Sequence, residues 1–175
     1  MSELLKEASL AIQEIYQGRE EIFRDEMTLF IDPQKIVPAL ATLKEQFQFN
    51  MLLDLTAVDY WPEEKPRFHL IYQLYSMDHN QLLRLRVPLD GNAPKIDTIE
   101  SVHANANWKE RELWDMFGIF IEGHSDLRRI LMPSDWQGHP LRKDYPLGYE
   151  EVQFTFNFDE IEERKPYSTG LRDLP

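Results

Sequence analysis

Apolar residues recur at helical spacing at the start of the chain. Leu5, Ala8, Ile12 and Ile15 follow one another at intervals of three or four residues, which places them on one face of a helix. The residues between them are mostly polar and suit a solvent-facing side. The pattern therefore predicts an amphipathic helix over residues 2–17.

A second helical pattern covers the chain up to residue 47, but it contains a proline. Pro38 in a helix interior would cost about 3 kcal/mol, because it lacks an N–H and its ring clashes with the preceding turn. We therefore expect a turn over residues 33–37 and a helix from about Pro38. Two short strands, over residues 21–24 and 27–31, are expected before it.

Three segments rich in Leu, Ile, Val, Tyr and Phe follow, separated by polar and proline-containing segments. They span residues 51–60, 68–75 and 82–87, and their composition is typical of strands. In the third segment apolar residues alternate with Arg84 and Arg86, which indicates one buried and one solvated face. The pattern predicts a three-stranded antiparallel meander and, with the helices, an α+β fold in which helices pack on an antiparallel sheet.

Helical signals return after residue 90. A short helix is expected near residues 99–105, and a second one over residues 108–117. Asn107 followed by Glu110 matches a capping box, in which two side chains satisfy free N–H groups at the start of a helix. These signals predict that the second helix begins just after Asn107.

Prolines and glycines punctuate the chain from residue 124 onward, and 52 residues are too many for an ordinary loop. We therefore expect an α+β domain over residues 1–123 and an extended arm over residues 124–175. The arm would wrap around the domain or bind a partner.

The composition limits the possible classes of function. The chain has 19 basic and 31 acidic residues, a net charge of −12, which repels phosphate backbones and anionic lipids. Without cysteine it has no disulfide, thiolate metal site or cysteine-ligated iron–sulfur cluster. No apolar run exceeds three residues, whereas a membrane helix needs about 20. We expect a soluble chain with no nucleic-acid partner and no direct membrane insertion.

The segment between residues 107 and 147 carries most of the candidate chemistry. His124, Asp126 and His139 could bind a metal ion, which would make the chain a stand-alone metal-dependent enzyme. The two histidines lie 15 residues apart in a proline- and glycine-rich stretch, however, and no HExxH-like helix fixes two ligands. Arginines and tryptophans interleave there, a composition typical of protein–protein interfaces. We therefore favour a partner-binding segment.

Three blocks in this segment resemble the C subunit of NADH-quinone oxidoreductase, part of the peripheral arm of bacterial respiratory complex I. They are ERELWDMFGI at Glu110–Ile119, GHSDLRRIL at Gly123–Leu131 and GHPLRKDYPL at Gly138–Leu147. One departure is Ser125, which stands where the family's His-Pro-Asp-Leu has proline.

The resemblance implies an α+β subunit with no redox centre of its own. Such a subunit packs on the quinone-site D subunit, near the iron–sulfur subunits B and I, on the cytoplasmic side of the bacterial inner membrane. FMN, iron–sulfur clusters and quinone would belong to partner subunits. The whole complex would pass electrons from NADH to a quinone and pump protons. An equivalent subunit of a ferredoxin-fed plastoquinone reductase or a membrane-bound hydrogenase remains an open alternative.

By the same resemblance, a set of charged residues would belong to a partner interface rather than to an active site. They are Glu110, Arg111, Glu112, Asp115, His124, Arg128, Arg129, His139, Arg142, Lys143 and Asp144. The resemblance thus implies that this chain has no catalytic, cofactor-binding or metal-binding residues of its own.

Overall fold

The computed structural model describes residues 2–145. The segments with helical or alternating patterns form helices and strands in it. In chain order the elements are α1 (Glu3–Tyr16), β1 (Arg19–Phe23), β2 (Glu26–Phe30), the short 3-10 helix η1 (Pro33–Lys35), α2 (Ile36–Phe47), β3 (Met51–Asp59), β4 (Phe68–Ser76), β5 (Gln81–Leu89), β6 (Lys95–Asp97), α3 (Ala106–Phe117) and β7 (Phe120–Glu122).

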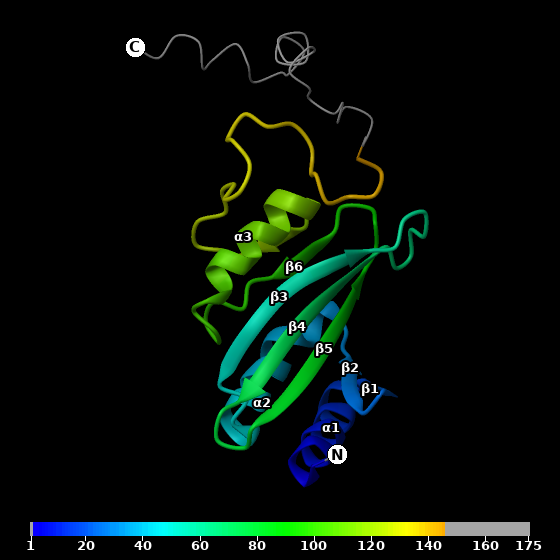
Figure 1. Cartoon of the computed structure of the whole chain (residues 1–175), viewed down its shortest axis with the longest axis vertical. Coiled ribbons are helices and arrows are strands. Elements are labelled where there is room, and N and C mark those ends of the chain that lie inside the picture. Colours follow the sequence, from blue (N-terminus) through cyan, green and yellow to red (C-terminus); the bar gives the residue numbers. More distant parts are fainter. Residues whose placement is uncertain (1, 146–175) are drawn as a thin grey trace, which may run out of the picture. The chain divides into compact units, whose positions relative to one another are not determined.

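The main sheet has the strand order β1-β2-β5-β4-β3 (Figure 1). Strands β3, β4 and β5 form the predicted antiparallel meander, whereas β2 pairs with β5 in parallel. The fold is α+β, as predicted, but the sheet is mixed rather than purely antiparallel. Strands β6 and β7 form a separate two-stranded parallel sheet.

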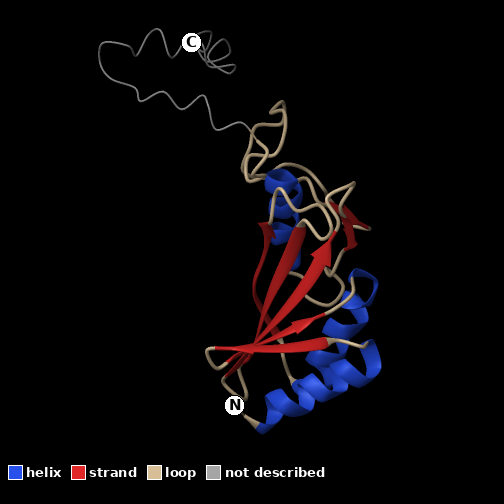
Figure 2. Ribbon diagram, turned by 90° about the vertical axis from the view of Figure 1, so that its right-hand side faces the viewer, coloured by secondary structure: helices blue, strands red, loops and turns tan. Residues whose placement is uncertain are grey.

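Helices α1 and α2 cover one face of the main sheet (Figure 2). The apolar residues of the alternating strands point to this side, and Leu83, Leu85 and Val87 of β5 are fully buried. Burial of such a side chain contributes about 1.5–3 kcal/mol to folding. On α1, Ile12 is buried as predicted, but Ile15 is 58% exposed and lies outside the core.

Two predicted boundaries in the first half are wrong by a few residues. Helix α2 begins at Ile36 rather than near Pro38. The proline is its third residue, where the backbone N–H has no partner within the helix, so its absence costs little. Strand β1 ends at Phe23, because Arg24 and Asp25 both have positive φ angles and form the two-residue turn of a hairpin.

The predicted start of α3 is also wrong. Residues 99–105 form turns instead of a short helix, and α3 begins at Ala106. Asn107 is already helical, and its side chain donates hydrogen bonds to Glu100 and Ser125. The capping box is therefore not formed.

Residues 124–145 contain neither helix nor strand, yet they form one compact unit with the residues before them, and this unit ends at Tyr145. The rest of the predicted arm, residues 146–175, lies outside the described residues. None of the described helices has the length and apolar character needed to cross a lipid bilayer.

Candidate functional site

The buried carboxylate of Asp115 on α3 fixes the backbone of the 124–145 segment. It accepts hydrogen bonds from the N–H groups of Ile130, Leu131 and Met132 at 3.0, 2.8 and 2.9 Å. Arg129 adds an ion pair at 2.5 Å to this fully buried side chain. Burial by itself would raise the pKa of Asp115, but these bonds outweigh it and the pKa is lowered. The ionised carboxylate therefore holds this part of the segment on the helix.

Two arginines bind the carbonyl groups of the same segment. Arg111, only 6% exposed, donates to the carbonyl oxygens of Arg128 and Arg129, both at 3.0 Å. Arg129 reaches the carbonyls of Trp136 and Gly138 at 2.8 and 3.1 Å. A planar guanidinium is suited to this task, because it presents several donors in a fixed geometry. The irregular backbone thus gains the partners that a helix or sheet would otherwise provide.

The C-terminal end of α3 is covered by the next part of the segment. Arg142 donates to the carbonyl of Phe117 at 2.5 Å, and His139 donates to the carbonyl of Asp115 at 3.0 Å. Gly118 has a φ of +68°, and a Cβ there would lie 2.5 Å from the His139 ring. Glycine is therefore required both to end the helix and to admit the imidazole.

A buried arginine fastens the far end of the segment to the sheet. Arg67, with a side chain 4% exposed, pairs with Asp59 at 2.9 Å and with Asp144 at 2.7 Å. The backbone N–H of Lys143 also donates to Asp59. Hydrogen bonds to Asp59 and Asp144 raise the pKa of Arg67. Burial opposes ionisation of Asp59, yet the Arg67 bond and backbone N–H groups lower the pKa of its carboxyl.

A third cluster joins the turns before α3 to the start of the segment. His124 Nε2 lies 3.6 Å from Glu100 and 3.8 Å from Glu110. These are the only three side chains of the described residues that group as possible metal ligands. The His124 Nδ1 accepts the N–H of Asp126, so Nε2 carries the proton and donates to the carbonyl of Asn107. A metal ion would need that nitrogen unprotonated, and the cluster fits a hydrogen-bond network better than a metal site.

Glu110 is the buried member of this network. It accepts the Thr98 hydroxyl at 2.6 Å and the Ile99 N–H at 2.7 Å. Burial raises the pKa of Glu110, and these two bonds offset the rise only in part. The alternative metal site of His124, Asp126 and His139 does not assemble, because among the described residues His139 and Asp126 do not join His124 in a ligand group.

The structure thus brings most of the predicted interface residues together as contacts within the chain. Glu110, Arg111, Asp115, His124, Arg129, His139, Arg142 and Asp144 all bind other residues of this unit. Glu112 is half-buried, and Arg128 and Lys143 are exposed. These contacts do not test partner binding, which stays a prediction. Sequence reasoning missed Asp59 and Arg67, which carry no local signal and lie 84 and 77 residues from their partners Lys143 and Asp144.

Large apolar side chains remain exposed around this network. Leu131 and Leu141 of the segment are 62% and 51% exposed, and Trp108 of α3 is 60% exposed. The backbone N–H of Leu131 donates to Asp115 and that of Leu141 donates to the carbonyl of Met116 at 3.0 Å, although both side chains face solvent. A rigid surface with exposed apolar groups is typical of a protein–protein contact.

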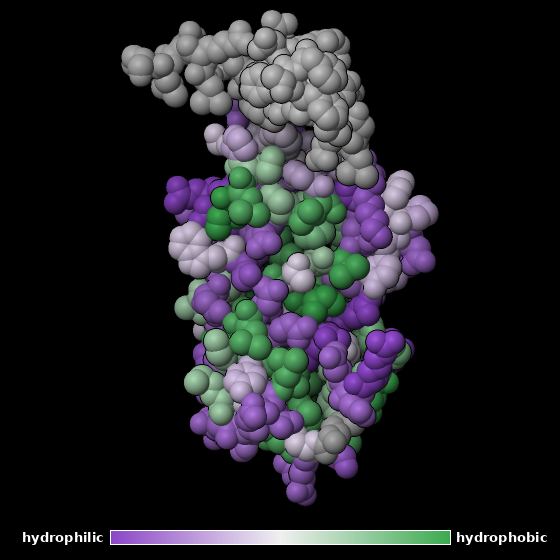
Figure 3. Space-filling view, in the orientation of Figure 1, coloured by the Kyte–Doolittle hydropathy of each residue, from purple (hydrophilic) through white to green (hydrophobic). Residues whose placement is uncertain are grey.

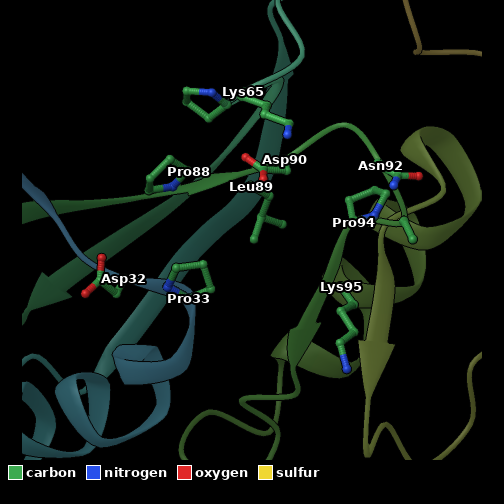
Figure 4. Close-up of a pocket in the computed structure, with 11 residues that line it drawn as sticks. Asp32, Pro33, Lys65, Pro88, Leu89, Asp90, Asn92, Pro94 and Lys95 are labelled. Carbon is green, nitrogen blue, oxygen red and sulfur yellow. The ribbon is translucent and has the colours of Figure 1, made fainter.

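An open depression lies elsewhere, between the end of β5 and the start of β6 (Figure 4). Its charged side chains Asp32, Lys65, Asp90 and Lys95 are all exposed and do not gather at one point (Figure 4). Catalytic sites instead tend to combine a concave pocket with buried, perturbed titratable groups. The depression lacks that character.

Comparison with solved structures supports the fold. The chain superimposes on the structure described as Nqo5 of the trypsin-resistant fragment (1-134), with a TM-score of 0.60 and 28% identity over 71% of this chain and 96% of that chain. It also matches a chain of the membrane-bound sulfane sulfur reductase, described as an archaeal respiratory membrane complex. That match has a TM-score of 0.70 at 21% identity and covers 83% and 85% of the two chains, which shows a shared fold.

Comparison with other sequences identifies the family. A relative named as the C subunit of NADH-quinone oxidoreductase, from Roseiflexus sp. (strain RS-1), is 41% identical over 167 residues, which cover 94% of this chain and 95% of the relative. One of the same name from Geobacter sulfurreducens is 47% identical over 125 residues, 71% and 77% of the two chains. The family model described as "Respiratory-chain NADH dehydrogenase, 30 Kd subunit" matches residues 29–151. The chain therefore belongs to the family of the 30 kDa subunit of respiratory-chain NADH dehydrogenase, as the resemblance in its sequence predicted.

Proposed function

We propose that this chain is a non-catalytic structural subunit of the peripheral arm of a proton-pumping NADH:quinone oxidoreductase. It contacts the D subunit, with subunits B and I nearby, on the cytoplasmic side of the bacterial inner membrane. Partner subunits hold the FMN, the iron–sulfur clusters and the quinone. Membership of the family and the names of the relatives support the choice of complex.

The proposal rests on one observation, which is that side chains of the α+β domain hold the irregular 124–145 segment in a fixed position. Side chains of α3 and Arg67 bind its backbone and its Asp144 side chain, so that Leu131 and Leu141 are presented on a fixed surface. Ordering such a surface in advance reduces the entropy lost on association. The segment is therefore suited to bind a neighbouring subunit.

The same network supports a structural rather than a catalytic role. The Asp115 carboxylate already accepts four hydrogen bonds, and Arg67 is enclosed between two carboxylates. A general acid or base must instead reach a reacting group on the substrate. The hydrogen bonds of Asp115 and Arg67 therefore stabilise the fold.

Substitution of the exposed leucines tests the proposal. Leu131→Glu and Leu141→Glu place a charge where we expect an apolar contact, and Leu10→Glu on α1, at a residue 57% exposed, is the matched control. The chain is tagged in cells that produce the complex, and the co-purified D subunit is measured by quantitative mass spectrometry. We expect recovery of the D subunit to fall about tenfold for the segment variants, the effect of losing one buried leucine.

Equal recovery of the D subunit with all three variants would contradict the proposed interface. Because all three side chains are exposed, we expect the variants to fold normally, and circular dichroism of each purified chain checks this. The subunits that co-purify also distinguish between the alternative complexes. Co-purification of an NADH-oxidising flavoprotein supports the proposal, whereas a ferredoxin-oxidising or hydrogenase partner would replace it.

A further inference from the structure

The sheet face opposite α1 and α2, here called the outer sheet face, forms a second continuous surface. No described helix crosses it in the view of Figure 1. Strand pairing sets its residues in two neighbouring rows, one of Phe30, Arg86, Ile71 and Thr56 and one of Pro88, His69 and Val58. In the same orientation, Figure 3 shows apolar residues running along the molecule between polar ones. This face therefore combines apolar side chains with a central guanidinium.

The guanidinium of Arg86 is held in place by uncharged neighbours. Its Nε donates to His69 Nδ1 at 2.8 Å, and its Nη2 donates to the hydroxyl of Tyr60. The rings of Phe30 and Tyr60 lie 5.3 and 5.4 Å from the guanidinium carbon. Burial, with the nearby charge of Arg86, lowers the pKa of His69 to about 4, so the imidazole is neutral at pH 7. The cluster keeps one full positive charge.

No carboxylate within the described part of the chain lies within ion-pair distance of Arg86. Arg84, two residues earlier on the same strand and face, pairs with Glu26 at 2.7 Å. Arg84 thus has a carboxylate partner and Arg86 has none among the described residues, although the chain carries 31 acidic residues. Within the described residues, two of the five N–H donors of Arg86 have acceptors, and the other three suit a planar carboxylate.

We propose that the outer sheet face binds a segment of a neighbouring subunit that places a carboxylate on Arg86 and apolar side chains over Val58, Ile71 and Pro88. Charge complementarity identifies the occupant as an acidic and apolar protein segment. The two rings and His69 hold the guanidinium in one orientation, so little rotamer freedom is lost when the carboxylate arrives. That the occupant is a subunit of the same complex rests on the proposed function.

A photo-crosslinking amino acid tests the surface directly. p-Benzoylphenylalanine replaces Val58, which is 38% exposed, and Leu10, which is 57% exposed on α1, serves as the control position. The intact complex is irradiated, purified through a tag on this chain and analysed by mass spectrometry. We expect position 58, but not position 10, to crosslink to one other subunit, within a peptide that contains Asp or Glu beside apolar residues.

Charge reversal then tests the role of Arg86. Arg86→Glu and the milder Arg86→Gln are each combined with the probe at position 58, and Arg84→Glu is the matched control. We expect the crosslink yield to fall about tenfold or more with the Arg86 variants and to change little with Arg84→Glu. Replacement of the crosslinked carboxylate by lysine should restore the yield with Arg86→Glu.

Several outcomes would overturn the inference. They are an equal loss of crosslinking with the Arg84 and Arg86 variants, or a crosslink from position 58 only to a second copy of this chain or to its own residues. An assembled complex without any crosslink at position 58 refutes the inference and leaves the proposed function intact. Failure of this chain to co-purify with any subunit of the complex refutes both.

Discussion

Replacement of Asp115 by asparagine should detach part of the 124–145 segment from α3. Asparagine has nearly the same shape, but it carries no charge and only one acceptor oxygen. In the structure one carboxylate oxygen accepts three backbone N–H groups and the other pairs with Arg129. Whichever way the amide is turned, its NH2 group faces donors that it cannot bind.

The size of the effect follows from these contacts. Each hydrogen bond to a charged group contributes about 1.5–3 kcal/mol, and removal of one partner from a buried ion pair costs about 3–5 kcal/mol. The single acceptor oxygen of the new amide keeps some of the bonds, so we expect a loss of about 3 kcal/mol. That corresponds to roughly a 100-fold increase in opening of the segment.

Hydrogen exchange of the amides of Ile130, Leu131 and Met132 measures this opening, and urea unfolding followed by circular dichroism measures global stability. Asp126→Asn is the control, because Asp126 and its partner Arg128 have side chains 52% and 72% exposed, and such pairs contribute under about 1 kcal/mol. Exchange rates that match between the two variants would refute the assigned role of the carboxylate.

The pH dependence gives an independent check. The pKa of Asp115 in the folded chain is below its ordinary value of 3.8, so its stabilisation is complete above that pH. It is lost as the pH falls through the folded-state pKa. The wild-type amides should therefore lose protection on acidification, whereas those of Asp115→Asn should be weakly protected throughout.

Two further predictions concern buried charges. Arg67→Met leaves Asp59, with a side chain 1% exposed, without its cation, and should reduce the free energy of unfolding by about 3–5 kcal/mol. Arg84→Met should cost under about 1 kcal/mol, and equal urea midpoints for the two variants would contradict this reasoning. The raised pKa of Glu110 implies that stability declines as the pH rises from 4.5 through the folded-state pKa. Glu110→Gln should remove that part of the decline, and urea midpoints across this pH range that keep the wild-type slope would count against it.

Residues with a regular local pattern were predicted correctly from the sequence. The alternation of Leu83, Leu85 and Val87 with arginines identified a strand buried on one face, and the spacing of Leu5, Ala8 and Ile12 identified α1. Burial of one face repeats with the period of the element, so the sequence alone carries this information. Element boundaries were less accurate where turn geometry decided them.

The family was also identified from the sequence. The three blocks between Glu110 and Leu147 resemble the family in residue order and spacing, and recognising them does not require knowing which residues they contact. The internal roles of their charged residues were not identified from the sequence. The family resemblance predicted that Asp115 and Arg129 belong to a partner interface, but nothing in the sequence indicated that the carboxylate would accept three consecutive N–H groups. Such contacts involve backbone atoms, which every residue has.

The sequence by itself thus determined the periodic helices and strands, the absence of cysteine chemistry and the family. Only the tertiary structure decided which charges meet. Arg67 and Asp144 are 77 residues apart, and their pairing depends on how the end of the sheet and the 124–145 segment come together. Side-chain identity specifies that an arginine prefers a carboxylate, but the path of the folded backbone selects which one. The same path leaves Arg86 without a carboxylate among the described residues while giving one to Arg84.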